Sequence, residues 1–148
     1  MNYRLADHPD IPELAKLLGL LFEQEEEFFP SLEQQMQGLK MILENPEEGV
    51  IFVATRDNQV LAMINILFTV STALGARVAV LEDMIVSADS RGKGIGSGLI
   101  EHAIEYCRGC GIKRISLLTD PGNVSAHAFY GRHGFQPSNM VVFRRMLE

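Results

Sequence analysis

The chain has 148 residues, of which 47% are hydrophobic and 22% are charged, and its formal net charge is −6. This length suits a single domain, residues 1–148, and a content of 6 Pro and 13 Gly excludes collagen-like and low-complexity chains. Apolar runs too short to cross a bilayer, an N-terminal segment without an apolar signal core, and only two Cys lead us to expect a cytoplasmic protein without a disulfide framework.

Two helices are expected in the first third of the chain, after a short strand over Tyr3–Ala6. Leu and Ile recur at helical spacing from Asp10 to Phe22, with Asp10 as the N-cap. A second helix is predicted from Ser31, its N-cap, to residue 44.

The rest of the chain alternates between strand and helix patterns. Strands are predicted over residues 50–55 and 59–69, joined by a hairpin turn, and then over 77–86, 113–119 and 141–147. Helices are predicted over residues 95–107 and 123–133. This order indicates a mixed α/β layered domain.

The segment from Arg91 to Gly98 leaves a predicted strand and opens a predicted helix. Its glycines at alternate positions remove Cβ atoms, so that backbone N–H groups can approach a ligand closely. These groups lie where the helix dipole favours an anion, and Arg91 and Lys93 add positive charge. The segment therefore predicts a phosphate or pyrophosphate site, although it matches neither the Rossmann nor the P-loop pattern.

Two segments resemble the signatures of the GNAT N-acetyltransferases. Arg91-Gly-Lys-Gly-Ile-Gly96 is similar to the family's pyrophosphate loop, and Asn123–Phe135 is similar to its second pattern, N-x-x-A-x-x-F-Y-x-x-x-G-F. The resemblance implies a central, mostly antiparallel sheet with two splayed strands, flanked by helices. It also implies acetyl transfer from acetyl-CoA to a primary amine in a ternary complex. Two alternatives stay open, a protein or peptide N-acetyltransferase and a catalytically silent acyl-CoA sensor.

The resemblance assigns the coenzyme site residue by residue. The pantetheine arm would contact the main chain at Met84, Ile85 and Val86. The pyrophosphate would be held by Arg91, Gly92, Lys93, Gly94, Ile95, Gly96 and Ser97, and the second signature would add Asn123, Ala126 and Phe129. Tyr130 matches the position whose phenol protonates the departing thiolate in many family members, a role for which a hydroxyl group of pKa about 10 is suited.

A general base is sought at Glu82 and Asp83, since a carboxylate on an apolar strand must be partnered or functional. Leu81-Glu82-Asp83 resembles the corresponding stretch of diamine N-acetyltransferases, which favours Glu82 as the base or water-binder and Asp83 as an acceptor-binding group. Adjacent residues of a regular strand face opposite sides. We therefore expect Asp83 to share a face with Leu81 and Ile85.

The charge distribution points to a cationic small-molecule acceptor. Residues 1–50 carry 11 Asp and Glu against 3 Lys and Arg, whereas the remaining residues carry 8 against 10. Glu25, Glu26 and Glu27 lie in the region that forms one wall of the acceptor site in the family, where they would bind an amine; a solvated helix end is the other interpretation. Without a dense basic patch, no nucleic-acid partner is expected.

No metal site is expected. Cys107-x-x-Cys110 lacks a second ligand pair and falls at the end of a predicted helix, where the dipole does not lower a thiol pKa. The four His residues have no metal-binding spacing. A homodimer is expected only because dimers are common in the family.

Overall fold

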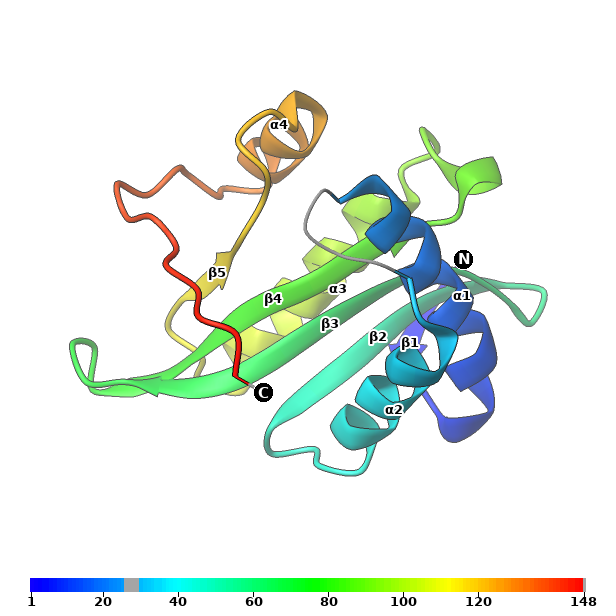
Figure 1. Ribbon diagram of the computed structural model, residues 1–148, viewed down its shortest axis with the longest axis horizontal. Coiled ribbons are helices and arrows are strands. Elements are labelled where there is room, and N and C mark those ends of the chain that lie inside the picture. The colour runs from blue at the N-terminus through cyan, green and yellow to red at the C-terminus, as the bar shows by residue number, and fades with distance from the viewer. Residues whose placement is uncertain (26–29, 148) are drawn as a thin grey trace.

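Five strands form one sheet in the order β1-β2-β3-β4-β5, with helices on both faces (Figure 1). The computed structural model describes residues 1–25 and 30–147. Strands β1 to β4 pair antiparallel, and β4 pairs with β5 in parallel. The strands are β1 (Asn2–Leu5), β2 (Gly49–Arg56), β3 (Gln59–Ser71), β4 (Ala76–Val86) and β5 (Ile115–Leu117). The prediction of a mostly antiparallel sheet in a mixed α/β fold is confirmed.

Helices α1 (Ile11–Gln24) and α2 (Leu32–Leu43) cover one face of the sheet, and α3 (Ile95–Gly109) covers the other (Figure 1). A fourth helix, α4 (Val124–Arg132), and two short 3-10 turns, η1 (His8–Asp10) and η2 (Ala88–Ser90), complete the helical elements of the described residues. Ser31 caps α2 as predicted, since its side chain accepts a hydrogen bond from the Gln34 N–H. Among the described residues, no helix combines the length and apolar character needed to span a membrane.

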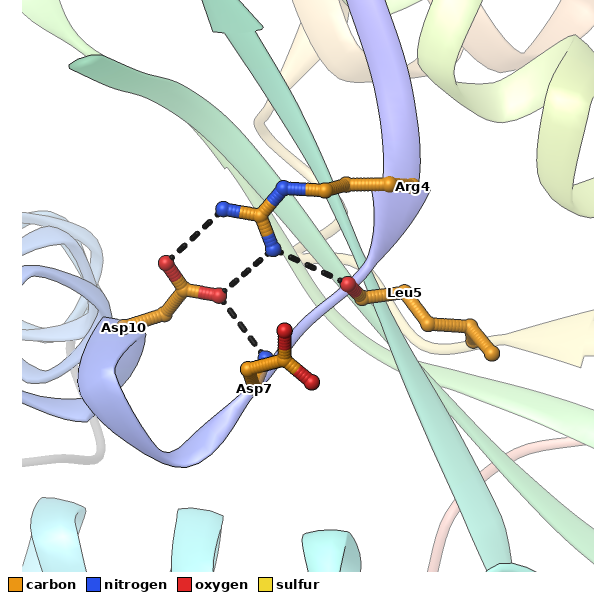
Figure 2. A network of polar contacts seen from close by, with 4 residues as sticks. All are labelled: Arg4, Leu5, Asp7 and Asp10. Carbon is orange, nitrogen blue, oxygen red and sulfur yellow. Dashed lines mark hydrogen bonds and ion pairs between the residues drawn. The ribbon is translucent and has the colours of Figure 1, made fainter. Parts of the chain in front are cut away.

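Asp10 precedes α1 as predicted, but its carboxylate serves the β1–α1 junction instead of capping the helix (Figure 2). The Arg4 guanidinium donates to both Asp10 oxygens, at 2.8 and 3.0 Å, and the Asp7 N–H donates to one of them at 2.8 Å. These bonds, that from Arg4 first, lower the pKa of Asp10. The ion pair between Arg4 and Asp10 anchors the end of the edge strand β1 to the start of α1.

The sheet separates two apolar clusters, because successive side chains of a strand point to opposite faces. Phe52 of β2 and Ile64 of β3 pack with Leu99 of α3. Ile51 and Met63, on the other face, pack with α1 and α2. Both sides of the central strands are thus buried, which explains their nearly continuous apolar sequence.

A β-bulge interrupts this alternation in β4. Ile66 of β3 lies opposite Leu81, and the preceding Asn65 lies opposite Asp83, so that Glu82 is the extra residue. Leu81 consequently packs on the α3 side, whereas Ile85 packs on the side of α1 and α2. The prediction that Leu81, Asp83 and Ile85 share one face is wrong, because the extra residue shifts the side-chain alternation by one.

The predicted strand over Val141–Leu147 is also wrong. The described residues 139–147 contain no strand, and Val141, Phe143 and Leu147 are 80%, 94% and 84% exposed. The β-branched and apolar residues of this segment favour an extended chain, but a strand exists only where a partner supplies a hydrogen-bonded ladder. The three-residue β5 pairs with β4 and supplies no such ladder to this segment.

Candidate active site

Strands β4 and β5 separate after a short parallel pairing. Ala79, Val80 and Leu81 pair with residues 115–117, and no pairing between the two strands is present beyond that point in the part of the chain described. Among the described strands, residues 83–86 of β4 therefore pair only with β3. The segment Met84–Val86, predicted to bind pantetheine, lies along this open edge, where alternate residues turn their main-chain N–H and C=O groups away from β3 and toward an extended ligand.

The loop that follows β4 is shaped by glycines in the left-handed region. Gly92 has a φ of 76° and Gly94, the N-cap of α3, a φ of 79°, conformations that strain any residue with a Cβ. The Arg91 guanidinium donates to the Val86 carbonyl at 3.2 Å, which ties the loop to the end of β4. The first N–H groups of α3 lack helical acceptors and lie beside two exposed basic side chains, Arg91 and Lys93. This arrangement suits an anion such as a pyrophosphate.

Gly96 is the point at which three elements meet. A Cβ there would lie 3.4–3.5 Å from the side chains of Val86, Met84 and Phe129. The start of α3, the end of β4 and helix α4 are therefore in close contact. Asn123 begins α4 as predicted, and its Oδ1 accepts a hydrogen bond from the Ala126 N–H at 3.1 Å.

Tyr130 lies on α4 between two aromatic rings. Its ring centroid is 5.3 Å from that of Phe129 and 5.7 Å from that of Phe135. Burial, and then the negative charges of Asp83 and Glu25, raise the pKa of Tyr130 to about 12. Three predicted site residues, from α4, β4 and the end of α1, thus lie within electrostatic reach of one another.

Asp83 is the half-buried carboxylate of this site, whereas the neighbouring Glu82 is exposed. Burial raises the pKa of Asp83 to about 6; a hydrogen bond from Asn65 opposes this rise, and the charge of Glu82 adds to it. The Asn65 Nδ2 donates to Asp83 Oδ2 at 2.8 Å. A carboxyl group with this pKa can both bind a cation and exchange a proton near neutral pH.

Two of the predicted acceptor-binding residues, Glu26 and Glu27, lie outside the described residues. Glu25 is described and immediately follows α1, as its C-cap. The structure therefore places Glu25 and Asp83 within electrostatic reach of Tyr130.

Two further polar residues at this site were not predicted. Asn65 holds Asp83, and the signal for it was its position as the polar residue within the apolar segment 60–68. His133 joins α4 to α3, with Nδ1 2.9 Å from a Glu101 oxygen and Nε2 3.0 Å from the Ser97 hydroxyl. Glu101 and Ser97 lie 32 and 36 residues before His133 in the sequence, so no local pattern could indicate these contacts.

The described residues form neither a metal-binding cluster nor a reactive thiol. Across residues 1–25 and 30–147, no three His, Cys, Asp or Glu side chains are placed to hold a metal ion. Cys107 is buried at the end of α3, and burial, with the charge of Cys110, raises the pKa of its thiol to about 11. Such a thiol is almost entirely protonated at neutral pH and is a poor nucleophile.

The comparison with known families agrees with this geometry. The sequence profile of the Acetyltransferase (GNAT) family matches residues 14–135. This chain belongs to the GNAT family of acetyltransferases. An uncharacterized N-acetyltransferase of Bacillus subtilis, YhfO, is 31% identical to this GNAT acetyltransferase over 146 residues, which cover 96% of the chain and 94% of the relative.

Solved structures share its fold. A possible acetyltransferase from Clostridium difficile superposes with a TM-score of 0.89 at 20% identity, covering 99% of this GNAT acetyltransferase and 97% of the other chain. An aminoglycoside acetyltransferase from an uncultured soil metagenomic sample, solved in complex with sisomicin, gives a TM-score of 0.79 at 19% identity, with 99% and 96% covered.

Members of the family use acetyl-CoA as co-substrate. The residues present fit such a molecule: an open strand edge for an extended arm, and a left-handed glycine loop at a helix N-terminus for a pyrophosphate. Glycine adopts the left-handed backbone of Gly92 and Gly94 with less strain than a residue that carries a Cβ.

Proposed function

We propose that this acetyltransferase moves the acetyl group of acetyl-CoA to a small, cationic primary amine, by direct transfer within a ternary complex. The observation that carries the proposal is the convergence of Asp83, Glu25 and Tyr130 beside the open edge of β4. This arrangement supports a proton donor, a proton acceptor and a cation-binding group beside the strand edge that we assign to the coenzyme.

The coenzyme is held by backbone groups and by positive charge. We assign the pyrophosphate to the loop from Arg91 to Ser97, and the pantetheine arm to the edge of Met84–Val86, with Asn123, Ala126 and Phe129 closing the channel from α4. The bound thioester supplies an activated acetyl group. The chain's own residues hold it against the strand edge and manage the protons.

Asp83 is our assignment for the group that takes the first proton. An alkylammonium ion bound to its carboxylate transfers one proton to it and becomes a neutral amine, whose lone pair can attack the thioester carbonyl. The prediction from sequence favours Glu82 for this role, but Glu82 is exposed. The raised pKa of Asp83, about 6, makes its carboxylate a stronger base than an ordinary aspartate.

We assign Tyr130 as the general acid that donates a proton to the departing sulfur. As the C–N bond forms and the C–S bond breaks, the phenol donates its proton to the thiolate. The second proton of the amine nitrogen then restores the phenol, and Asp83 releases its proton to water. In the free enzyme the pKa of Tyr130 is raised by burial and then by two carboxylates, so a cationic acceptor bound beside them offsets the second contribution and makes the phenol more acidic when the proton is required.

An amine panel that follows release of the free CoA thiol tests the proposal. We expect thiol release that depends on both acetyl-CoA and a primary amine, with intersecting double-reciprocal plots, since no covalent acetyl-enzyme is formed. In a thermal-shift comparison, CoA should stabilise the protein, whereas ATP and NAD should not. Stabilisation by CoA without thiol release from any amine would instead favour an acyl-CoA sensor, and release with peptides alone would favour a peptide N-acetyltransferase.

Cytoplasmic location and a homodimer belong to the proposal as predictions from the sequence and the family. Light scattering at two protein concentrations measures the oligomeric state directly.

A further inference from the structure

A pocket of about 250 Å³ lies between the two N-terminal helices and the sheet, on the face that carries Asp83. Its apolar wall consists of Leu18 and Phe22 from α1 together with Leu39 and Ile42 from α2. Asn65 and Asp83, from β3 and β4, also line it. Its volume is slightly below the range of about 300–1,000 Å³ that is usual for drug-sized ligands.

Two of the polar residues on the helical side of this pocket, Ser31 and Gln35, are already used within the protein. The Gln35 side chain accepts from the Ser31 N–H at 2.6 Å and donates to the Ala15 carbonyl at 2.8 Å. The Ser31 hydroxyl caps α2. A ligand therefore meets mainly apolar surface along α1 and α2, with the exposed Gln34 beside it, and a carboxylate on the sheet.

The Asn65 side chain fixes the orientation of that carboxylate. Its Nδ2 donates to Asp83 Oδ2 at 2.8 Å, across the bulged register that places these two residues opposite each other. Two acceptor oxygens would repel each other while Asp83 is ionised, so the amide nitrogen must face the carboxylate. One oxygen of Asp83 thereby accepts a hydrogen bond, and within the described residues the other oxygen remains available to a ligand.

Asn65 is a poor choice for stability alone. Its side chain is 2% exposed, and its Oδ1 has no hydrogen-bond partner among the residues that the structure describes. A buried carbonyl without a partner destabilises the folded state relative to an apolar side chain of similar size. The presence of Asn at this position is explained if it serves Asp83.

We propose that Asn65 is the positioning residue of Asp83, and that the pocket takes the apolar body of a small primary amine whose nitrogen binds Asp83. The inference rests on the proposed function and narrows its acceptor to a monoamine. A second or third ammonium group, as in a polyamine, would have to be desolvated against Leu18, Phe22 and Leu39, which is unfavourable.

The groups around Asp83 are of one sign. Glu82 adjoins it on β4, and Glu25 at the end of α1 acts, like Asp83, on the pKa of the uncharged Tyr130. An ammonium ion bound to Asp83 is therefore attracted by each of these carboxylates, and Asn65 is the group that supplies a hydrogen bond to the ionised carboxylate of Asp83.

The test compares 2-phenylethylamine with spermidine in the wild-type enzyme and in Asn65→Leu. We expect kcat/KM of the wild type to be at least tenfold higher for 2-phenylethylamine. In Asn65→Leu, the KM for 2-phenylethylamine should rise about tenfold or more, the usual effect of losing a hydrogen bond to a charged group. The acidic limb of the pH profile should move to higher pH, because the ionised form of Asp83 loses its donor.

The same variant separates positioning from a structural role. Asn65→Leu should melt at the same temperature as the wild type or higher, and its KM for acetyl-CoA should be unchanged. Thr55→Val, at another buried polar residue outside the pocket, is the matched control and should leave the amine KM and the pH profile unchanged.

Each outcome bears on one proposal. Spermidine or a lysine peptide preferred over 2-phenylethylamine, or an unaltered amine KM and pH profile in Asn65→Leu, would overturn the inference while acetyl transfer itself stands. A lower melting temperature of Asn65→Leu with unaltered kinetics would make Asn65 structural. If no amine releases the CoA thiol from the wild type, the proposed function fails first.

Discussion

The Tyr130 phenol keeps its proton throughout the physiological pH range, because burial and the charges of Asp83 and Glu25 raise its pKa to about 12. Its ring also packs between Phe129 and Phe135. A substitution that keeps the ring therefore isolates the hydroxyl.

For Tyr130→Phe we expect kcat to fall about 100-fold, the lower end of what general acid catalysis contributes, with little change in the KM for acetyl-CoA. Steady-state kinetics with the best amine measures both constants. A kcat close to that of the wild type would show that water or another group protonates the thiolate.

Asp83 gives a prediction about pH. Its pKa in the folded protein, about 6, lies above the ordinary value of 3.8, and the ionised form is the one that accepts a proton. We therefore expect kcat/KM to rise with pH through about 6, and Asp83→Asn to abolish this limb with most of the activity. If Glu82→Gln abolishes the limb while Asp83→Asn retains it, the exposed carboxylate is the base.

The raised pKa of Asp83 affects stability in the opposite direction from activity: activity rises with pH, whereas the contribution of Asp83 to the free energy of unfolding falls. A carboxyl group whose pKa is raised on folding stabilises the protein below its unfolded pKa, and this stabilisation is lost as pH rises from about 4 to about 6. A shift of about two pKa units corresponds to about 3 kcal/mol. Asp83→Asn should thus raise the melting temperature by more at pH 8 than at pH 4. Equal changes in melting temperature at the two pH values would show that the folded state does not disfavour the ionised form of Asp83.

At the scale of elements, two local departures from regular structure build the site. The bulge at Glu82 turns Asp83 toward the side of α1 and α2, and the left-handed glycines 92 and 94 let the chain enter α3 beside the open edge of β4. Helix α4 is then held against the start of α3 by His133, through Ser97 and Glu101.

The two ends of α3 offer a matched pair of substitutions. Gly94 and Gly109 both have open space around a Cβ, but only Gly94 has a positive φ and lies in the loop. Gly94→Ala should cost about 1–2 kcal/mol of stability through strain and raise the KM for acetyl-CoA tenfold or more. Gly109→Ala, in the helix, should stabilise by up to about 1 kcal/mol and leave that KM unchanged. Equal KM values in the two variants would remove the loop from the coenzyme site.

At the scale of the whole molecule, charge is divided unevenly between the first third of the sequence and the rest. The first 50 residues carry a net −8 and the remainder a net +2, and the acidic part includes Glu25, which lies within electrostatic reach of Tyr130. Opposite charge raises the local concentration of a cationic substrate, and salt screens the effect over a Debye length of about 10 Å at 0.1 M.

We expect the KM for a cationic amine to rise severalfold between low salt and about 0.3 M salt. The triple variant Glu25→Gln, Glu26→Gln, Glu27→Gln should show a higher amine KM with a weaker salt dependence, and the same KM for acetyl-CoA. Glu33→Gln, at an exposed residue in the first turn of α2, is the control. A triple variant that matches the control would make the acidic segment a solvated helix end.

The sequence by itself determined what depends on neighbours along the chain. The two signatures, the glycine loop, the helices with their caps at Ser31 and Asn123, and the hairpin turn were all predictable, because backbone conformation and capping are set within a few residues. Only the tertiary structure decided the contacts that depend on register. One extra residue at Glu82 reversed the face of Asp83 and set it opposite Asn65, and α4 packed His133 onto Ser97. The segment 141–147 has the composition of a strand, yet it stays unpaired, since a ladder requires a partner that local pattern cannot supply.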